Sequence, residues 1–142
     1  MAHAKFPLPV SLLKSGHGCL VLKSLAIAVI DDDESFRVAL VESLSSLGYE
    51  TSGYESAEEY LDVTANGSID CVVTDVHMPG MSGLDLTKHL AAVGTTTPII
   101  LITARSDASL EAKAAAAGAV CLLRKPFEID GLIKRIEEAV KG

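Results

Sequence analysis

Residues 25–33 read LAIAVIDDD, an unbroken apolar run that ends in three aspartates. A run of this kind is typical of a strand that is covered on both faces, as in a parallel sheet, rather than of one side of an antiparallel sheet. The aspartates stand where the strand ends and the next helix begins. A buried strand followed by a polar turn and a helix predicts an α/β fold made of repeated strand–helix units.

Similar apolar segments recur along the rest of the chain. Strands are predicted at Leu25–Ile30, Tyr49–Tyr54, Ile69–Thr74, Pro98–Thr103 and Ala119–Leu123. Helices are predicted after Asp33, from Ser56, from Ser82, over Asp107–Ala117 and after Pro126. This alternation of strands and helices predicts one parallel sheet with right-handed crossovers.

Three of these helices carry informative local signals. Ser56 and Glu59 have the spacing of a capping box, in which the serine accepts from a backbone N–H and the glutamate reaches back. Ser82 and Asp85 can cap the following helix. The helix over Asp107–Ala117 is rich in alanine, so its helical propensity is high, but it has only small side chains with which to anchor itself.

The composition fits one globular domain and excludes several classes of protein. The chain has 142 residues, of which 49% are hydrophobic, too many for a disordered protein. The net charge of the chain is -7. Residues 1–24 contain three lysines and no acidic residue, so residues 25–142 are more acidic than the chain as a whole. An acidic domain repels a phosphate backbone, so direct binding of nucleic acid is not expected. We expect residues 1–24 to be a flexible or non-native extension and residues 25–142 to be the folded domain.

The cysteines and the longest apolar runs indicate a cytoplasmic protein. Cys19, Cys71 and Cys121 are odd in number and lack the spacing of a metal site. Cys71 and Cys121 lie within apolar runs, where a thiol usually acts as a small core side chain. No apolar run approaches the length of about 18 residues that is needed to cross a bilayer. We therefore expect reduced cysteines and no contact with a membrane.

Four of the five predicted strands end in side chains that can carry chemistry. These are Asp31 and Asp32, Asp75, Thr103, and Lys125. Taken singly, each has an ordinary explanation, because a strand-end aspartate is often only a cap or a turn former. In an open parallel sheet, however, the carboxyl ends of the strands meet at one functional crevice, so we expect these groups to lie together.

The three aspartates in this group predict a metal site. Two unit charges about 4 Å apart repel by about 4 kcal/mol at an effective dielectric constant near 20. Either their pKa values rise or a cation lies among them. Carboxylate oxygens without histidine or cysteine ligands suit Mg²⁺ or Mn²⁺. Asp75 stands between the other groups in the sheet, which makes it the best candidate to attack phosphorus and form an aspartyl phosphate.

These residues together resemble the receiver domain of bacterial two-component response regulators. The resemblance rests on Asp31 and Asp32, the sequence DVHMPGMSG at residues 75–83, Thr103, and the sequence KPF that begins at Lys125. It covers the chain from about residue 25 to residue 140. The nitrogen-fixation regulators are the branch that the sequence resembles most.

The resemblance implies a fold and a set of partners. The fold would be flavodoxin-like, a three-layer (βα)₅ arrangement with a five-stranded parallel sheet in the order 2-1-3-4-5. Asp75 would accept a phosphoryl group from a sensor histidine kinase or a phosphotransfer protein. The domain would act as a switch rather than as an enzyme. Phosphorylation would change the surface formed by the helix at 107–117, the fifth strand and the last helix, and could drive the formation of a homodimer.

The resemblance also implies a ligand set. Asp32 and Asp75 would bind Mg²⁺ directly, the backbone carbonyl of His77 would be a third ligand, and Asp31 would act through water. Lys125 would pair with the carboxylate or the phosphoryl group of the acceptor.

Three further positions bear on switching. Thr103 would receive a phosphoryl oxygen when the domain changes state. Leu122, three residues before the lysine, stands where the family often has an aromatic ring, so coupling between such a ring and Thr103 is in question. His77 and Arg105 flank the expected site, and either they tune hydrolysis of the aspartyl phosphate or they are simple solvent-facing side chains.

Two other functions fit part of the pattern. A haloacid-dehalogenase-like phosphatase would use Asp31 as its nucleophile and Asp33 as its general acid, but it needs a later strand that ends in paired acids and it leaves Asp75 unexplained. A receiver-shaped scaffold that works without phosphorylation would not need the complete set of phosphorylation groups. The sequence does not identify the cognate kinase, the signal, or an effector domain beyond Gly142.

Overall fold

The computed structural model describes residues 24–63 and 68–141. The extension expected at residues 1–24 therefore lies, except for Ser24, outside the described residues. The elements are β1 (Ala26–Ile30), α2 (Glu34–Ser46), β2 (Glu50–Tyr54), α3 (Ala57–Val63), β3 (Cys71–Asp75), α4 (Gly83–Ala92), β4 (Ile99–Thr103), α5 (Ala108–Ala117), β5 (Cys121–Arg124) and α6 (Ile129–Lys141). Strands and helices alternate as the sequence predicts.

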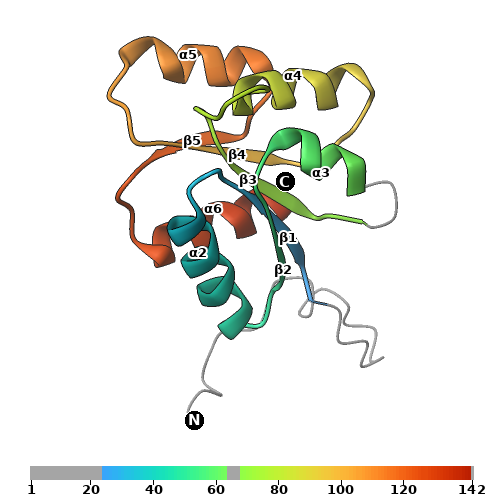
Figure 1. Ribbon diagram of the computed structural model, residues 1–142, viewed down its shortest axis with the longest axis vertical. Coiled ribbons are helices and arrows are strands. Elements are labelled where there is room, and N and C mark those ends of the chain that lie inside the picture. Colours follow the sequence, from blue (N-terminus) through green and yellow to red (C-terminus); the bar gives the residue numbers. More distant parts are fainter. Residues whose placement is uncertain (1–23, 64–67, 142) are drawn as a thin grey trace.

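The strands form one parallel sheet in the order β2-β1-β3-β4-β5, which confirms the expected fold class (Figure 1). β1 pairs with both β2 and β3, so the chain moves outward in one direction first and then in the other. The strand order reverses beside β1, and this reversal opens the crevice in which α/β proteins of this kind bind their ligands.

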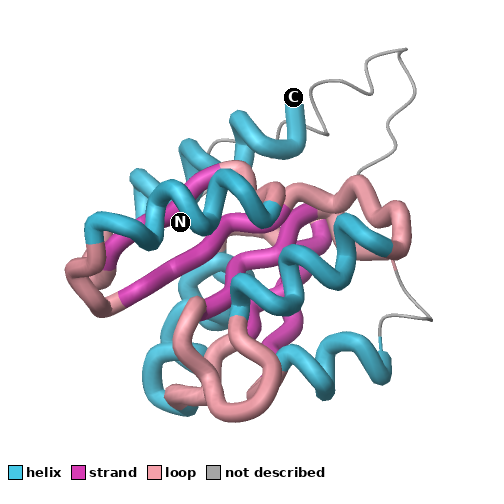
Figure 2. The backbone as a smooth tube through the Cα atoms, turned by 90° about the horizontal axis from the view of Figure 1, so that it is seen from above, coloured by secondary structure: helices cyan, strands magenta, loops and turns pink. Residues whose placement is uncertain are grey.

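Helices cover both faces of the sheet and make two apolar layers (Figure 2). One layer joins the sheet to α3, α4 and α5, and includes Tyr60, Leu86 and Leu110. The other joins the sheet to α2 and α6, and includes Leu44 and Ile136. None of the described helices is long and apolar enough to span a bilayer.

Alternate residues of the central strands point to opposite faces, so a continuous apolar run supplies both layers. Cys71 contributes to the second of these layers and is fully buried. Burial is the largest of the effects that raise the pKa of the Cys71 thiol to about 12, which agrees with the prediction that this cysteine is a core side chain.

Two strands begin two residues later than predicted: β3 starts at Cys71 instead of Ile69, and the same shift occurs at the start of the fifth strand. Ala119 and Val120 were predicted to belong to it, but β5 begins at Cys121. Gly118 ends α5 with φ at 103°, and the N–H of Ala119 then donates to the carbonyl of Ala114 at 3.0 Å. This C-terminal cap uses Ala119 to complete the helix, so the strand starts later.

Two other predictions about helix ends need smaller corrections. Ser56 accepts from the N–H of Glu59 at 3.0 Å as expected, but the Glu59 carboxylate accepts from the N–H of Glu55 at 2.7 Å rather than from that of Ser56. Asp107 is the N-cap of α5 and not its first residue. The capping box of Ser82 and Asp85 at the start of α4 is complete.

Candidate functional site

The carboxyl ends of the strands bring the predicted site residues to one edge of the sheet. Asp31 follows β1, Asp75 is the last residue of β3, Thr103 is the last residue of β4, and Lys125 follows β5. Asp75 was predicted to follow its strand, but it pairs with Ile102 and belongs to β3. Because all neighbouring strands are parallel, these positions lie side by side.

Three carboxylates form the centre of the site. Asp31, Asp32 and Asp75 each offer an oxygen, and these oxygens lie within 4.8 Å of one another. Asp31 is 1% exposed, whereas Asp75 is partly buried and Asp32 is exposed. The cluster therefore runs from the protein interior to the solvent. Three hard anionic oxygens at this spacing fit a divalent cation such as Mg²⁺, which also retains water ligands.

Lys125 contacts a different carboxylate from the one that the resemblance implies. Its Nζ lies 3.0 Å from Oδ2 of Asp31, so the ion pair in the structure joins Lys125 to Asp31 instead of to Asp75. Oδ1 of Asp31 accepts from the N–H of Asp33 at 2.9 Å. Lys125 also lies over the ring of Phe36, with Nζ 3.9 Å from the ring centroid. The ion pair and the hydrogen bond offset the cost of burying the Asp31 carboxylate, which is almost inaccessible to solvent.

The surroundings of Asp75 disfavour its charged form. Burial is the main cause that raises the pKa of Asp75 from 3.8 to about 6, and the neighbouring charge of Asp31 adds to the rise. Lys125 acts in the opposite direction but does not cancel these effects. A carboxylate in this position gains from a nearby cation and keeps an oxygen available for chemistry.

Thr103 closes the site on the side of β4. It is 1% exposed, and its Oγ1 accepts from the backbone N–H of Arg105 at 3.0 Å. The loop between β4 and α5 is also tied to β5, because Nη1 of Arg124 donates to Oγ of Ser106 at 2.9 Å. These two hydrogen bonds, one of them to the hydroxyl of Thr103, restrain the loop that follows β4.

Gly83 allows α4 to begin directly against Asp75. A Cβ atom at Gly83 would overlap the backbone carbonyl oxygen of Asp75 and would also crowd Leu101. The N–H of Gly83 donates to the carbonyl of Val76 at 2.9 Å and closes the base of the loop after β3. Sequence analysis found the motif that contains this glycine but not the close approach that requires it.

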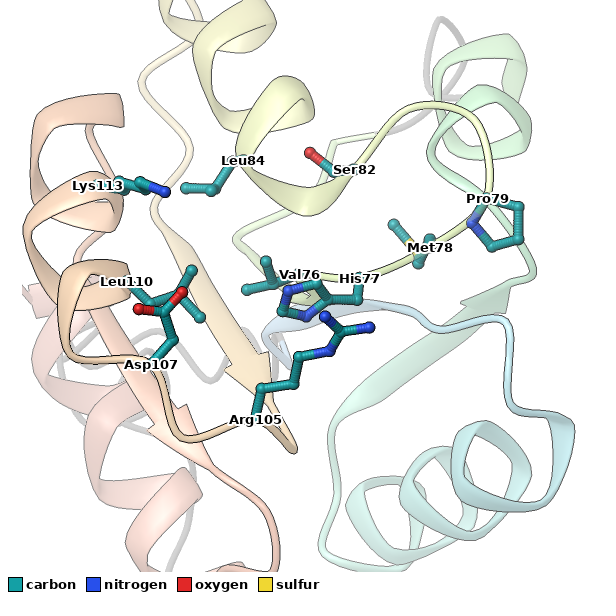
Figure 3. A pocket seen from close by; sticks show the side chains of 10 residues that line it. All are labelled: Val76, His77, Met78, Pro79, Ser82, Leu84, Arg105, Asp107, Leu110 and Lys113. Atoms are coloured by element: carbon teal, nitrogen blue, oxygen red, sulfur yellow. The ribbon is translucent and has the colours of Figure 1, made fainter.

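A groove of about 500 Å³ lies beside the carboxylates, between the loop after β3 and the start of α5 (Figure 3). In Figure 3 the His77 ring and the Arg105 guanidinium lie near each other at this groove. Partial burial is the first cause that lowers the pKa of His77, and the charge of Arg105 is the second. Both side chains line this groove, and neither belongs to the carboxylate cluster.

The comparisons with known proteins agree with this geometry. Residues 27–137 match the response regulator receiver domain family. The chain belongs to this family of receiver domains. Its members are phosphoacceptor signalling domains that generally bind Mg²⁺ in an acidic pocket and interact with histidine kinases or phosphotransfer proteins.

Two curated relatives and one solved structure illustrate the similarity. The transcriptional regulatory protein FixJ of Bradyrhizobium diazoefficiens is 40% identical over 115 residues, which are 81% of this chain and 56% of that protein. The DNA-binding transcriptional regulator NtrC of Escherichia coli is 36% identical over 112 residues, which are 79% of this chain and 24% of that protein. The crystal structure of FixJ-N superposes with a TM-score of 0.78 at 33% identity, covering 84% of this chain and 95% of that one.

These similarities confirm the predicted family, including its likeness to the nitrogen-fixation regulators. The chain spans about half the length of the FixJ relatives that it matches. Nothing in the comparisons supports the phosphatase alternative. In the structure, the Asp33 carboxylate accepts from the N–H of Phe36 at 3.2 Å as the N-cap of α2, which gives it a structural role.

Proposed function

We propose that Asp75 is the phosphoacceptor of this receiver domain. The observation that carries the proposal is the position of Asp75 at the end of a central strand, within 4.8 Å of Asp31 and Asp32 and with a raised pKa. An oxygen of its carboxylate attacks phosphorus while the P–N bond to the histidine of a kinase or phosphotransfer protein breaks. The departing imidazole keeps the electron pair of that bond and takes up a proton.

We assign the metal site to the same cluster. Asp32 and Asp75 supply direct oxygen ligands, the carbonyl of His77 supplies a third, and Asp31 acts through water. Mg²⁺ or Mn²⁺ held by these residues would supply positive charge that offsets the carboxylates and the phosphoryl oxygens. Support comes from the donor set: among the described residues, the group that could hold a metal consists of three carboxylates and includes no histidine or cysteine side chain.

Lys125 and Thr103 complete the reaction site in this proposal. Lys125 is paired with Asp31 in the structure, and its flexible ammonium group can turn to a phosphoryl oxygen on Asp75. The hydroxyl of Thr103, which accepts from the N–H of Arg105, donates a hydrogen bond to another phosphoryl oxygen. The loop between β4 and α5 then moves, because it is attached to Thr103.

The surface around α5, β5 and α6 is the proposed output. A groove of about 280 Å³ lies between α5 and β5 and includes Leu122 and Arg135. Val120, at its edge, is 51% exposed, which is unusual for a large apolar side chain in this structure. Leu122, which stands where the family often has an aromatic ring, is partly buried. We propose that phosphorylation changes this surface and promotes formation of a homodimer.

The kinase or phosphotransfer protein is proposed to dock against α2 and the start of α6, on the other side of the site from the output surface. A shallow apolar groove between α2 and the start of α6 includes Phe36 and Phe127, which meet edge to face at 6.1 Å. Val38 on α2, two residues after Phe36, is 43% exposed. This apolar surface adjoins Lys125 and gives a partner helix contact area next to Asp75.

We further propose the wider context of the chain. Residues 25–142 form the receiver domain, which assists only its own phosphotransfer and dephosphorylation and is not an enzyme for a separate substrate. It binds no nucleic acid directly and no membrane. The free thiols of Cys71 and Cys121 support a cytoplasmic location.

His77 and Arg105 are proposed to set the lifetime of the aspartyl phosphate. Their side chains line the groove beside Asp75, where they can admit or exclude a water molecule (Figure 3). Replacing each in turn by alanine and following the loss of phosphate over time tests this role. Unchanged lifetimes would show that both are ordinary surface side chains.

Labelling with a small acyl phosphate tests the phosphoacceptor. Wild-type protein is incubated with acetyl phosphate with and without Mg²⁺, quenched in acid, and mapped by mass spectrometry. We expect Mg²⁺-dependent modification at Asp75, none in Asp75→Asn, and normal labelling in the control Asp130→Asn on α6. Turnover through Asp31 would favour the phosphatase, and unmodified wild-type protein would favour the scaffold.

A further inference from the structure

The loop between β3 and α4, residues 76–82, has one contact that sequence analysis did not anticipate. Oε2 of Glu58, on the first turn of α3, accepts from the backbone N–H of Met81 at 2.9 Å. Within the described residues, this is the only hydrogen bond that joins positions 77–82 to an element other than α4. Glu58 is otherwise an exposed acid that could be mistaken for a solubilising surface charge.

The loop is shaped to receive this carboxylate. Gly80 has a positive φ of 76°, which other residues rarely adopt. A Cβ atom at Gly80 would lie 2.7 Å from Oε2 of Glu58, so the carboxylate occupies the space that a side chain would need. Glycine at this position therefore serves both the turn and the approach of Glu58.

The contact lies on a loop that is also attached at its base, through Met78, and at its last residue, where Ser82 forms the capping box with Asp85. The bond from Gly83 to Val76 closes its base at 2.9 Å. Met78 is 8% exposed and belongs to the same apolar cluster as Tyr60 of α3. Glu58 adds an attachment to α3 at Met81, in the part of the loop between Met78 and Ser82. It therefore restrains the exposed part of the loop, which the other attachments reach only from its ends and through Met78.

We propose that Glu58 is a positioning residue that orients the loop and thereby the carbonyl of His77 toward the metal site. This inference rests on the proposed function, in which that carbonyl is a metal ligand. Glu58 itself does not touch the metal. Glu58 holds the loop in place before the metal binds, so less conformational freedom is lost when the His77 carbonyl becomes a ligand. Residues that do not touch the metal commonly orient its ligands in this way.

Calorimetric titration with Mg²⁺ on the full chain tests the proposal. Glu58→Ala removes the hydrogen bond and should weaken Mg²⁺ binding by about two- to tenfold. Glu58→Gln loses the charge but keeps a carbonyl oxygen that can accept from Met81, and should bind nearly as the wild type does. Asp62→Ala removes an exposed acid from the same helix and should also leave the affinity unchanged.

Amide exchange in the metal-free protein gives a second readout. The Met81 amide should exchange faster in Glu58→Ala than in the wild type, Glu58→Gln or Asp62→Ala. Wild-type affinity in Glu58→Ala would overturn the proposal. So would equal weakening in Asp62→Ala or Glu58→Gln, because the effect would then be one of charge. A wild-type protein that binds no Mg²⁺ would instead contradict the proposed metal site itself.

Discussion

Replacing Asp75 by asparagine should stabilise the metal-free protein at neutral pH. Asp75 has a pKa raised from 3.8 to about 6, chiefly by burial and then by the charge of Asp31. The folded state therefore holds a proton on Asp75 more tightly than the unfolded state does. Below pH 4 both states are protonated there and no stability is lost. As the pH rises through 6, the folded state must accept a poorly solvated charge, so its stability falls.

The size of this effect follows from the pKa. A rise from 3.8 to about 6 corresponds to about 3 kcal/mol. Solvent screens part of this cost at a half-buried carboxylate, which leaves about 1–2 kcal/mol. The asparagine of Asp75→Asn carries no charge, so folding does not have to bury one. The unfolding free energy of the variant should therefore be higher than that of the wild type by this amount at pH 7.5. The two proteins should be nearly equal in stability at pH 4.

Urea unfolding followed by circular dichroism, without divalent ions, measures the difference at several pH values. Glu42→Gln on α2 is the control, since Glu42 is exposed and away from the strand ends. Addition of Mg²⁺ should stabilise the wild type more than Asp75→Asn, because the cation relieves the same repulsion. A difference that is absent at pH 7.5, or that is as large at pH 4, would refute the reasoning.

Three other substitutions test the surroundings of the site. Gly83→Ala should lower the unfolding free energy by about 1–3 kcal/mol, because the added methyl group would overlap the backbone of Asp75. Gly131→Ala on α6 is the control, since a methyl group there meets open space and should not destabilise the protein. Equal urea midpoints for the two variants would contradict the first expectation. Lys125→Ala should cost about 1–3 kcal/mol in the same metal-free assay, because it leaves a buried carboxylate without its partner, and a loss below 0.5 kcal/mol would show that water replaces the ammonium group. Arg124→Ala should speed amide exchange around Ser106 with little change in global stability, and unchanged exchange would mean that their hydrogen bond does not restrain the loop.

The sequence was sufficient to predict which groups meet, because topology decides this. Once the apolar runs are recognised as parallel strands, Asp31, Asp75, Thr103 and Lys125 must emerge at one edge of the sheet. Their neighbours in space do not depend on loop conformation. The strand order, by contrast, was expected from the family resemblance and does not follow from the apolar runs alone.

The sequence was not sufficient to predict which groups bond. Asp31 and Asp75 are both acids at that edge, and a separation of a few ångströms decides which of them pairs with Lys125. The contact between Glu58 and Met81 depends on the rotation of α3 relative to a loop 23 residues later. The late start of β5 depends on how Gly118 caps the preceding helix. Such details arise from tertiary packing and leave no periodic signal in the chain.

The ion pair between Asp31 and Lys125 joins residues that are 94 positions apart, beside the first and the last strand. During synthesis, the ribosome releases the first aspartates long before this lysine. A nascent chain that lacks β5 cannot offset the buried charge, and it cannot assemble the site around Asp75. The carboxylate site therefore reaches its complete arrangement only after Lys125 has been synthesised and β5 has joined the sheet.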